Sequence, residues 1–268
     1  MTTLPAVTAV DLELERGWLT VWFNQPETRN ALTYDLVADL KSVLDRVRDD
    51  RDVRGITLRG RHGVFCAGGN LKQFKQTFQG GATRDEIIAM SKEVAVLLDA
   101  INDAPQVVLA VIEGAAMAGG FGIACAADAV ICEASARFAM TETSLGISPA
   151  QIAPFVIQKL GYATARRLML TAARFDGREA HALGFADFLA EGMQAAEKIE
   201  RGLRAQVLRC APGAVADTKS LIRALPGMSR AEAIQAAAEN FTGRLLSDEG
   251  REGVASFLEK RKPAWGLD

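Results

Sequence analysis

The stretch that decides the fold runs from Val107 to Gly122 and reads VVLAVIEGAAMAGGFG. Its first part, residues 107–112, is apolar and mostly β-branched, which predicts a short strand buried on both faces. Residues 114–120 are only Gly, Ala, and Met, so few side chains would keep a ligand from the main chain. A helix beginning at Gly119 and Gly120 would leave its first N–H groups unpaired, and its dipole would favour negative charge. The stretch therefore predicts a main-chain site for a developing oxyanion, with tight helix–sheet packing as the plain structural alternative.

The composition is that of an ordinary globular protein. Of its 268 residues, 49% are hydrophobic and 24% are charged, and a net charge of −2 gives no reason to expect binding to nucleic acid or to a membrane surface. No apolar run reaches the roughly 18 residues needed to span a bilayer, and no signal peptide is recognised, so we expect a cytoplasmic protein. The cysteines lack metal-ligand spacing, which predicts buried free thiols and no metal site. They are Cys66, Cys125, Cys132 and Cys210.

Strand and helix patterns alternate through the first part of the chain. Arg16-Gly17 separates two strand-like segments and predicts a hairpin. The order of the later segments predicts an α/β core with parallel pairing. Strands are expected at residues 10–14, 18–23, 55–58, 107–112, 129–132 and 137–140, and helices at 33–48 and after the capping box at 83–86.

Helical patterns dominate from about Pro149 to the end, interrupted by a strand-like patch at residues 185–189. No Gly/Ser-rich or Pro-rich linker separates the two halves. We therefore expect a core over residues 1–200 and a helical C-terminal region over residues 201–268 that packs on or beyond it.

Three features could carry chemistry together. The first is the small-residue turn from Phe65 to Leu71 (FCAGGNL), and the second is the turn at Gly119 and Gly120. Each could offer one free N–H, and two converging donors would form an oxyanion hole. The third is Glu142, in an apolar segment where a buried carboxylate is costly unless it is paired or usefully perturbed. A glutamate that faces the surface is the plain alternative for Glu142.

Four segments carry a resemblance to one protein family. They are Asn24–Leu32 (NQPETRNAL), Val64–Leu71 (VFCAGGNL), Ile112–Gly122 (IEGAAMAGGFG) and Phe257–Pro263 (FLEKRKP). In order and spacing they resemble motifs of the crotonase (enoyl-CoA hydratase/isomerase) superfamily, nearly from end to end of the chain. The resemblance implies an α/β fold, a crotonase-type spiral of ββα units with a helical C-terminal trimerisation region, assembled as a homotrimer or as a hexamer of two trimers.

The resemblance also implies roles for individual residues. The substrate would be an acyl-CoA thioester, with no cofactor beyond its coenzyme A. The N–H groups of Gly69 and Gly119 would hold the thioester oxygen of an enolate, and Glu142 would be the catalytic carboxylate. Arg29 and Lys260 would lie near the CoA phosphates, with Lys260 reaching a neighbouring subunit. The residues implied in substrate binding are Arg29, Ala67, Asn70, Gly122, Ala150, Gln151 and Lys260.

The chain departs from the family pattern at several positions. Typical hydratases use two glutamates around a water; the second corresponds to Glu142, but the first falls on Gly122. Residues 145–155 and 175–180 resemble bacterial 3-methylglutaconyl-CoA and isohexenylglutaconyl-CoA hydratases of leucine and acyclic terpene breakdown. That branch also tends to lack the first glutamate. Its substrates carry a second carboxylate, which we expect to use the space left at Gly122.

Three functions follow as alternatives. The favoured one is addition of water to the 2,3 double bond of a branched, glutaconyl-type enoyl-CoA, with Glu142 alone handling the proton. The second is a Δ3,Δ2-enoyl-CoA isomerase, because one base suffices to move a double bond. The third is a non-catalytic CoA-binding or scaffold subunit, which the missing carboxylate at Gly122 would suit. The segment between Leu71 and Met90 is expected to set the size of the acyl pocket.

Overall fold

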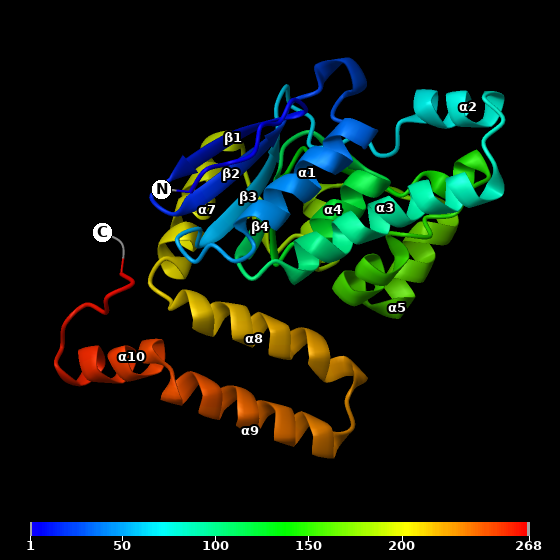
Figure 1. The fold of residues 1–268 in the computed structure, drawn as a ribbon. Coiled ribbons are helices and arrows are strands. Elements are labelled where there is room, and N and C mark those ends of the chain that lie inside the picture. Colours follow the sequence, from blue (N-terminus) through cyan, green and yellow to red (C-terminus); the bar gives the residue numbers. More distant parts are fainter. Residues whose placement is uncertain (1, 267–268) are drawn as a thin grey trace.

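The predicted hairpin starts the larger of two sheets in the computed structural model, which describes residues 2–266 (Figure 1). Arg16 and Gly17 both have positive φ, as a tight hairpin turn requires, and they join the two antiparallel strands β1 and β2. Every later neighbour in this sheet is parallel, in the order β1-β2-β3-β4-β6-β9. The strands are β1 (Val10–Glu15), β2 (Trp18–Phe23), β3 (Gly55–Gly60), β4 (Val107–Ile112), β6 (Ala129–Glu133) and β9 (Phe188–Ala190). The predicted parallel core is confirmed.

A second, three-stranded sheet has the order β5-β7-β8. It consists of β5 (Ala115–Met117), β7 (Arg137–Ala139) and β8 (Arg174–Asp176). The sequence predicts β7 but neither β5 nor β8. Strands of three residues are too short to show an alternation, and β5 contains only Ala and Met, so the segment expected as a turn holds a strand before its helix.

Helices cover both faces of the large sheet (Figure 1). On one face lie α1 (Tyr34–Val47), α3 (Arg84–Asp103) and α4 (Gly119–Ala126), and on the other lies α7 (Met193–Val207). The capping box at Thr83 and Glu86 opens α3 as predicted. The apolar stripe of α1 is buried, as its spacing predicts. Its members are Leu36, Val37, Leu40, Val43, Leu44 and Val47.

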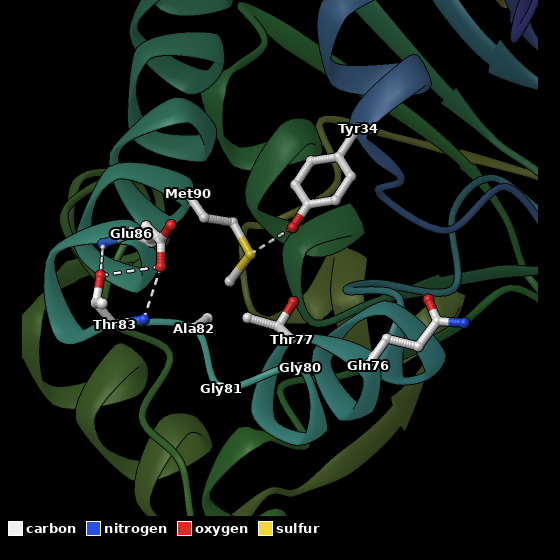
Figure 2. Close-up of a pocket in the computed structure, with 9 residues that line it drawn as sticks. All are labelled: Tyr34, Gln76, Thr77, Gly80, Gly81, Ala82, Thr83, Glu86 and Met90. Atoms are coloured by element: carbon white, nitrogen blue, oxygen red, sulfur yellow. Dashed lines mark hydrogen bonds between the residues drawn. The ribbon is translucent and has the colours of Figure 1, made fainter.

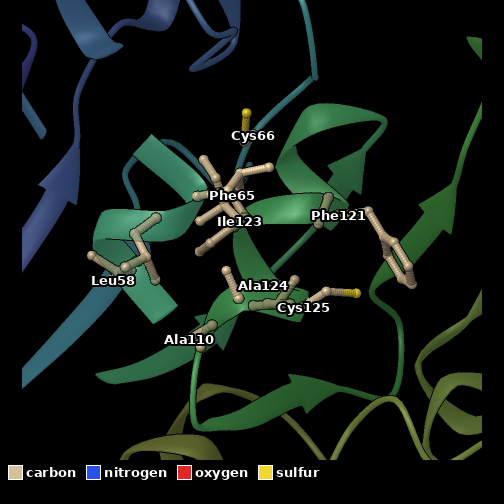
Figure 3. Close-up of a cluster of buried hydrophobic side chains, with 14 of the residues drawn as sticks. Leu58, Phe65, Cys66, Ala110, Phe121, Ile123, Ala124 and Cys125 are labelled. Carbon is tan, nitrogen blue, oxygen red and sulfur yellow. The ribbon is translucent and has the colours of Figure 1, made fainter. Parts of the chain in front are cut away.

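Helix α4 is buried along nearly its whole length, because it is apolar on every side. Figure 3 shows Phe121, Ile123 and Ala124 of this helix among side chains from neighbouring elements, including Leu58 and Phe65. Phe121 also stacks on Phe185 with 4.2 Å between ring centroids. The N-terminus of α4 is therefore fixed by packing on several sides.

The remaining helices are α2 (Leu71–Gln79), α5 (Ala153–Thr171), α6 (Gly177–Ala182), α8 (Pro212–Ala224), α9 (Arg230–Leu246) and α10 (Asp248–Leu258), with short 3-10 turns at Pro26–Thr28, Glu142–Leu145 and Leu225–Gly227. Helices α8 to α10 form an arm that extends away from the body (Figure 1). Lys219 of α8 ties the arm to the body by donating to Asp128 at 2.6 Å and to the Gln106 carbonyl at 3.1 Å. The expected division after residue 200 falls inside α7, which packs on the sheet, so the change in packing comes at the turn before α8.

Three of the predicted buried thiols, those of Cys66, Cys125 and Cys132, are buried, whereas Cys210 is exposed. Cys210 follows the last helix of the body, at the base of the arm, where little covers it. Within residues 2–266 we find no helix that combines the length and apolar character of a membrane span.

A buried charged cluster fixes α7 to the sheet. The Arg59 guanidinium of β3 pairs with Glu113 and, at 3.3 Å, with Glu200 of α7, and it lies 4.6 Å from the ring centroid of Trp22. All three charged side chains are buried. Glu200 also pairs with Arg204 of α7, so removing Arg59 would leave Glu113 as the buried charge without an ion pair among the described residues.

We predict that Arg59→Ala lowers the free energy of unfolding by about 3–5 kcal/mol, because Glu113 loses its buried partner, whereas Glu200 keeps its ion pair with Arg204. Arg178→Ala is the control, since Arg178 pairs with Glu191 at the surface and should contribute less than about 1 kcal/mol. Urea unfolding followed by circular dichroism measures both. Equal losses from the two variants would contradict this account of the cluster.

Candidate functional site

The two small-residue turns predicted from the sequence lie side by side. A parallel bridge joins Cys66 to Ala116, with the Cys66 N–H donating to the Ala115 carbonyl at 3.0 Å and the Met117 N–H donating to the Cys66 carbonyl at 2.9 Å. The approach is close, because a Cβ at Gly68 would lie 2.8 Å from the Cβ of Ala118. Only a glycine fits at Gly68, whose φ is also positive.

Leu32 packs against both turns. Its N–H donates to the Gly68 carbonyl at 2.8 Å, and it forms a parallel bridge with Gly69. A Cβ at Gly119 would lie 2.5 Å from the Leu32 Cδ1. Gly69 and Gly119, which come from segments about fifty residues apart, are thus held against one residue, Gly69 by the main chain of Leu32 and Gly119 by its side chain.

The N–H groups of both glycines are available as donors. Gly119 is the first residue of α4, and the first turn of this helix closes with the Gly122 N–H donating to the Ala118 carbonyl at 3.1 Å. The preceding N–H groups have no acceptor within the helix. Across the described residues, no backbone acceptor is found for Gly69 or Gly119. One such donor at the start of α4 and a second in the adjacent loop can stabilise a developing negative charge.

Glu142 is held near these turns by the small sheet. It follows β7 by three residues, and the last residue of β7, Ala139, accepts from the Ala118 N–H at 2.8 Å. The Glu142 side chain is half-buried, and its Oε2 is buried without a hydrogen-bond partner among the described residues. Burial raises the pKa of Glu142 above its ordinary value of 4.5. Glu142 is therefore not a surface-facing glutamate. A raised pKa suits its carboxylate to accepting a proton.

The space expected at Gly122 is filled, and the expectation that it could receive a second carboxylate is wrong. Gly122 is buried, and a Cβ there would lie 2.2 Å from Cγ2 and 2.8 Å from Cβ of Ile152. Ile152, which is 3% exposed, occupies the direction in which a side chain at Gly122 would point. No sequence pattern predicts this contact, because the two residues are thirty positions apart.

Arg29, Ala67 and Asn70 lie along the first glycine turn. The Ala67 N–H donates to the Arg29 carbonyl at 3.1 Å, and the Arg29 side chain is exposed beside it. The Asn70 Oδ1 accepts from the N–H groups of Lys72 and Gln73 at 3.1 and 3.3 Å, so it caps the start of α2. Asn70 is therefore first of all a structural residue that orients the turn.

The other predicted binding residues lie outside the two turns. Gln151 donates from Nε2 to the Ser91 Oγ of α3 at 2.8 Å, which ties the start of α5 to α3, and Ala150 beside it is exposed. Lys260 is exposed just after α10, at the end of the arm away from α2 and α4 (Figure 1). Within one subunit the structure does not bring Lys260 to the site.

A cavity of about 540 Å³ lies between the start of α1, the end of α2 and the start of α3. Figure 2 shows the nine residues that line it, with the Tyr34 hydroxyl donating to the Met90 Sδ at 3.1 Å. None of the predicted site residues is among them, but Tyr34 follows Leu32 by two residues and Met90 precedes Ser91. The sequence indicated the segment from Leu71 to Met90 as the determinant of pocket size, and it missed Tyr34, which the helical pattern of α1 alone does not distinguish from a solvated residue.

The comparisons with known proteins identify the class. Residues 13–267 match the enoyl-CoA hydratase/isomerase family, and the chain belongs to this family. It is therefore an enzyme of the hydratase type with the crotonase fold, as the four motifs predicted.

Individual relatives cover almost the whole chain. The structure of Pseudomonas aeruginosa AtuE is 42% identical, with a TM-score of 0.94 over 97% of this chain and 100% of that one. An enoyl-CoA hydratase/isomerase from Marinobacter aquaeolei is 36% identical, with a TM-score of 0.92 over 96% and 99%. The mitochondrial methylglutaconyl-CoA hydratase of Homo sapiens is 28% identical over 94% of this chain and 75% of its own length.

The raised pKa of Glu142 predicts a pH-dependent effect of its removal. Folding disfavours the ionised carboxylate, so the stability linked to this group is fully present below pH 4.5 and is lost as the pH rises through the raised pKa. Glu142→Gln stays neutral, and its melting temperature relative to wild type should therefore rise between about pH 4 and pH 8.

Glu252→Gln is the matched control of opposite sign. The hydrogen bond from Arg261 lowers the pKa of Glu252 to about 2, so this ionised carboxylate stabilises the fold at neutral pH. Its removal should lower the melting temperature near pH 7 and have less effect as the pH falls. If the difference in melting temperature between Glu142→Gln and wild type stayed constant across the pH range, a buried Glu142 with a raised pKa would be contradicted.

Proposed function

We propose that this enzyme adds water to the 2,3 double bond of an enoyl-CoA thioester, with Glu142 as the proton-transferring side chain. The observation that carries the proposal is the buried, unpartnered Oε2 of Glu142, on a segment tied to two turns with unpaired N–H groups. The N–H groups of Gly69 and Gly119 would form an oxyanion hole for the thioester oxygen.

One carboxylate can complete this reaction in two steps. Glu142 takes a proton from water as the water oxygen bonds to C3, and the electrons of the double bond move to the thioester oxygen. The two N–H groups stabilise the resulting enolate, because they are already oriented and need no rearrangement. The protonated Glu142 then delivers its proton to C2, and the carbonyl re-forms. A pKa above 4.5 suits a group that must both accept and return a proton.

We further propose a branched, glutaconyl-type acyl group, of the kind that leucine and acyclic terpene breakdown produce. The segment at residues 145–155 and the similarity to methylglutaconyl-CoA hydratase support this substrate class. Glu86 is the only charged side chain among the nine that line the cavity of Figure 2. We therefore assign the uncharged branch of the acyl group, and not its carboxylate, to that cavity.

A Δ3,Δ2-enoyl-CoA isomerase is the second candidate. The contact between Ile152 and Gly122 favours it, since it leaves no room there for a second carboxylate to hold a water. One base that removes a proton and returns it elsewhere suffices for isomerisation. The retained Glu142 and both glycine turns speak against a non-catalytic scaffold.

We propose no cofactor beyond the coenzyme A of the substrate, with Arg29 near its phosphates, and three buried thiols accord with the reducing cytoplasm. We also propose assembly as a homotrimer or a hexamer of two trimers through the arm. The arm exposes a series of large apolar side chains, which an interface would cover. They are Ile222, Leu225, Ile234, Phe241, Leu245, Leu246, Val254, Phe257 and Leu258.

Turnover on a panel of thioesters tests the proposed reaction. We expect water addition to 3-methylglutaconyl-CoA or isohexenylglutaconyl-CoA to be faster than to crotonyl-CoA, and Glu142→Gln to reduce it by about 10²- to 10⁴-fold while thioester binding persists. Products are measured by liquid chromatography and mass spectrometry. Double-bond migration in a 3-enoyl-CoA without water addition would instead make the protein an isomerase, and full activity of Glu142→Gln would remove Glu142 from the mechanism.

The role of the Gly119 N–H can be separated from the effect of added bulk. Proline is tolerated at the first position of a helix but has no N–H, so Gly119→Pro should lower kcat by about 10²- to 10³-fold relative to Gly119→Ala. Both variants place a Cβ against Leu32, and only alanine keeps the donor. Equal kcat values in two folded variants would exclude this N–H from the oxyanion hole.

A further inference from the structure

Ile152 packs more tightly against Gly122 than Leu32 packs against Gly119, the first residue of α4. The atoms that a Cβ at Gly122 would meet are the Cγ2 and Cβ of Ile152, at 2.2 and 2.8 Å. These atoms are close to the main chain, and a β-branched side chain has little rotamer freedom, so they cannot swing aside. At Gly119, by contrast, the nearest atom is Cδ1 of Leu32, the far end of a flexible side chain.

The backbone around Ile152 is itself held. Gln151 donates a hydrogen bond to Ser91 of α3, and the Ala153 N–H donates to the Pro149 carbonyl at 3.0 Å. The position of Ile152, and through it that of Gly122, therefore depends on α3 and α5. The Gly122 N–H donates to the Ala118 carbonyl and closes the first turn of α4.

We propose that Ile152 is a positioning residue for the site and determines its specificity between water addition and proton transfer alone. It locks the first turn of α4, which carries the Gly119 N–H, and it fills the volume beside Gly122 with methyl groups. A water molecule needs both room and polar partners, and Ile152 provides neither. Water is thereby kept from the Gly122 side of α4 only, so the water added in the proposed reaction must be held on the Glu142 side alone. The second part of this inference rests on the proposed function, whereas the packing part does not.

A melting-temperature cycle tests the packing. We expect Gly122→Ala to lower the melting temperature by roughly 3 to 10 °C in the wild-type and Ile152→Val backgrounds, because valine keeps both crowded atoms. In the Ile152→Gly background, which lacks both atoms, the same alanine should cost nothing. Gly202→Ala is the control, since Gly202 is a helical glycine of α7 whose Cβ would have no neighbour within 4 Å. Equal losses from Gly122→Ala in all three backgrounds would overturn the packing part.

Two rates measured on the same protein test the exclusion of water. Exchange of the α-protons of butyryl-CoA with D₂O requires Glu142 and the oxyanion hole, but no water is added to the substrate. Hydration of crotonyl-CoA requires the same two groups and also a water molecule that attacks the double bond. We expect Ile152→Ala, which removes three carbon atoms beside Gly122, to raise the ratio of hydration to exchange about 3- to 10-fold. Ile152→Val should keep the wild-type ratio to within about twofold.

Leu168→Ala is the matched cavity control, because Leu168 is also buried on α5 and loses three carbon atoms to alanine. It should destabilise the protein and leave the ratio unchanged. The same ratio in Ile152→Ala and Leu168→Ala would overturn the exclusion of water. If the wild type neither exchanges protons nor hydrates any thioester of the panel, the proposed function fails, and the exclusion of water fails with it, while the melting-temperature cycle still decides the packing.

Discussion

The parallel contact between Cys66 and Ala116 holds the site together, because it lays the loop after β3 against the strand that leads into α4. Neither segment could form the site alone. The loop brings Gly69, the strand leads to Gly119, and β7 on the other side of that strand leads to Glu142. Small residues are required throughout, since a Cβ at Gly68 would meet Ala118 at 2.8 Å.

The polarity of this site comes mainly from the main chain. Its candidate donors are the N–H groups of Gly69 and Gly119, and burial raises the pKa of the Glu142 carboxylate. Main-chain dipoles that are already oriented need no rearrangement when charge develops near them. Burial disfavours the ionised form of Glu142, so this carboxylate costs folding stability at neutral pH.

The helices on the two faces of the large sheet pack against it in different ways. On the side of α4 the packing is apolar and aromatic, and it holds the helix start still. On the side of α7 a small apolar cluster that includes Ala196 packs on the sheet, and the buried ion pairs of Arg59 with Glu113 and Glu200 add to it. Beyond both lies the arm, whose exposed apolar side chains have no partner within the described part of one subunit.

The amino-acid sequence by itself determined the hairpin, the strand at Val107–Ile112, the stripe of α1 and the family motifs, because each depends on residues close together in the chain. It also indicated Glu142 and both glycine turns, since small residues and an apolar-flanked carboxylate are visible locally. Only the tertiary structure decided that Ile152 fills the space at Gly122 and that Tyr34 and Met90 border a cavity. These outcomes depend on which side chains meet across separate elements, and no periodicity or spacing along the chain encodes such a meeting.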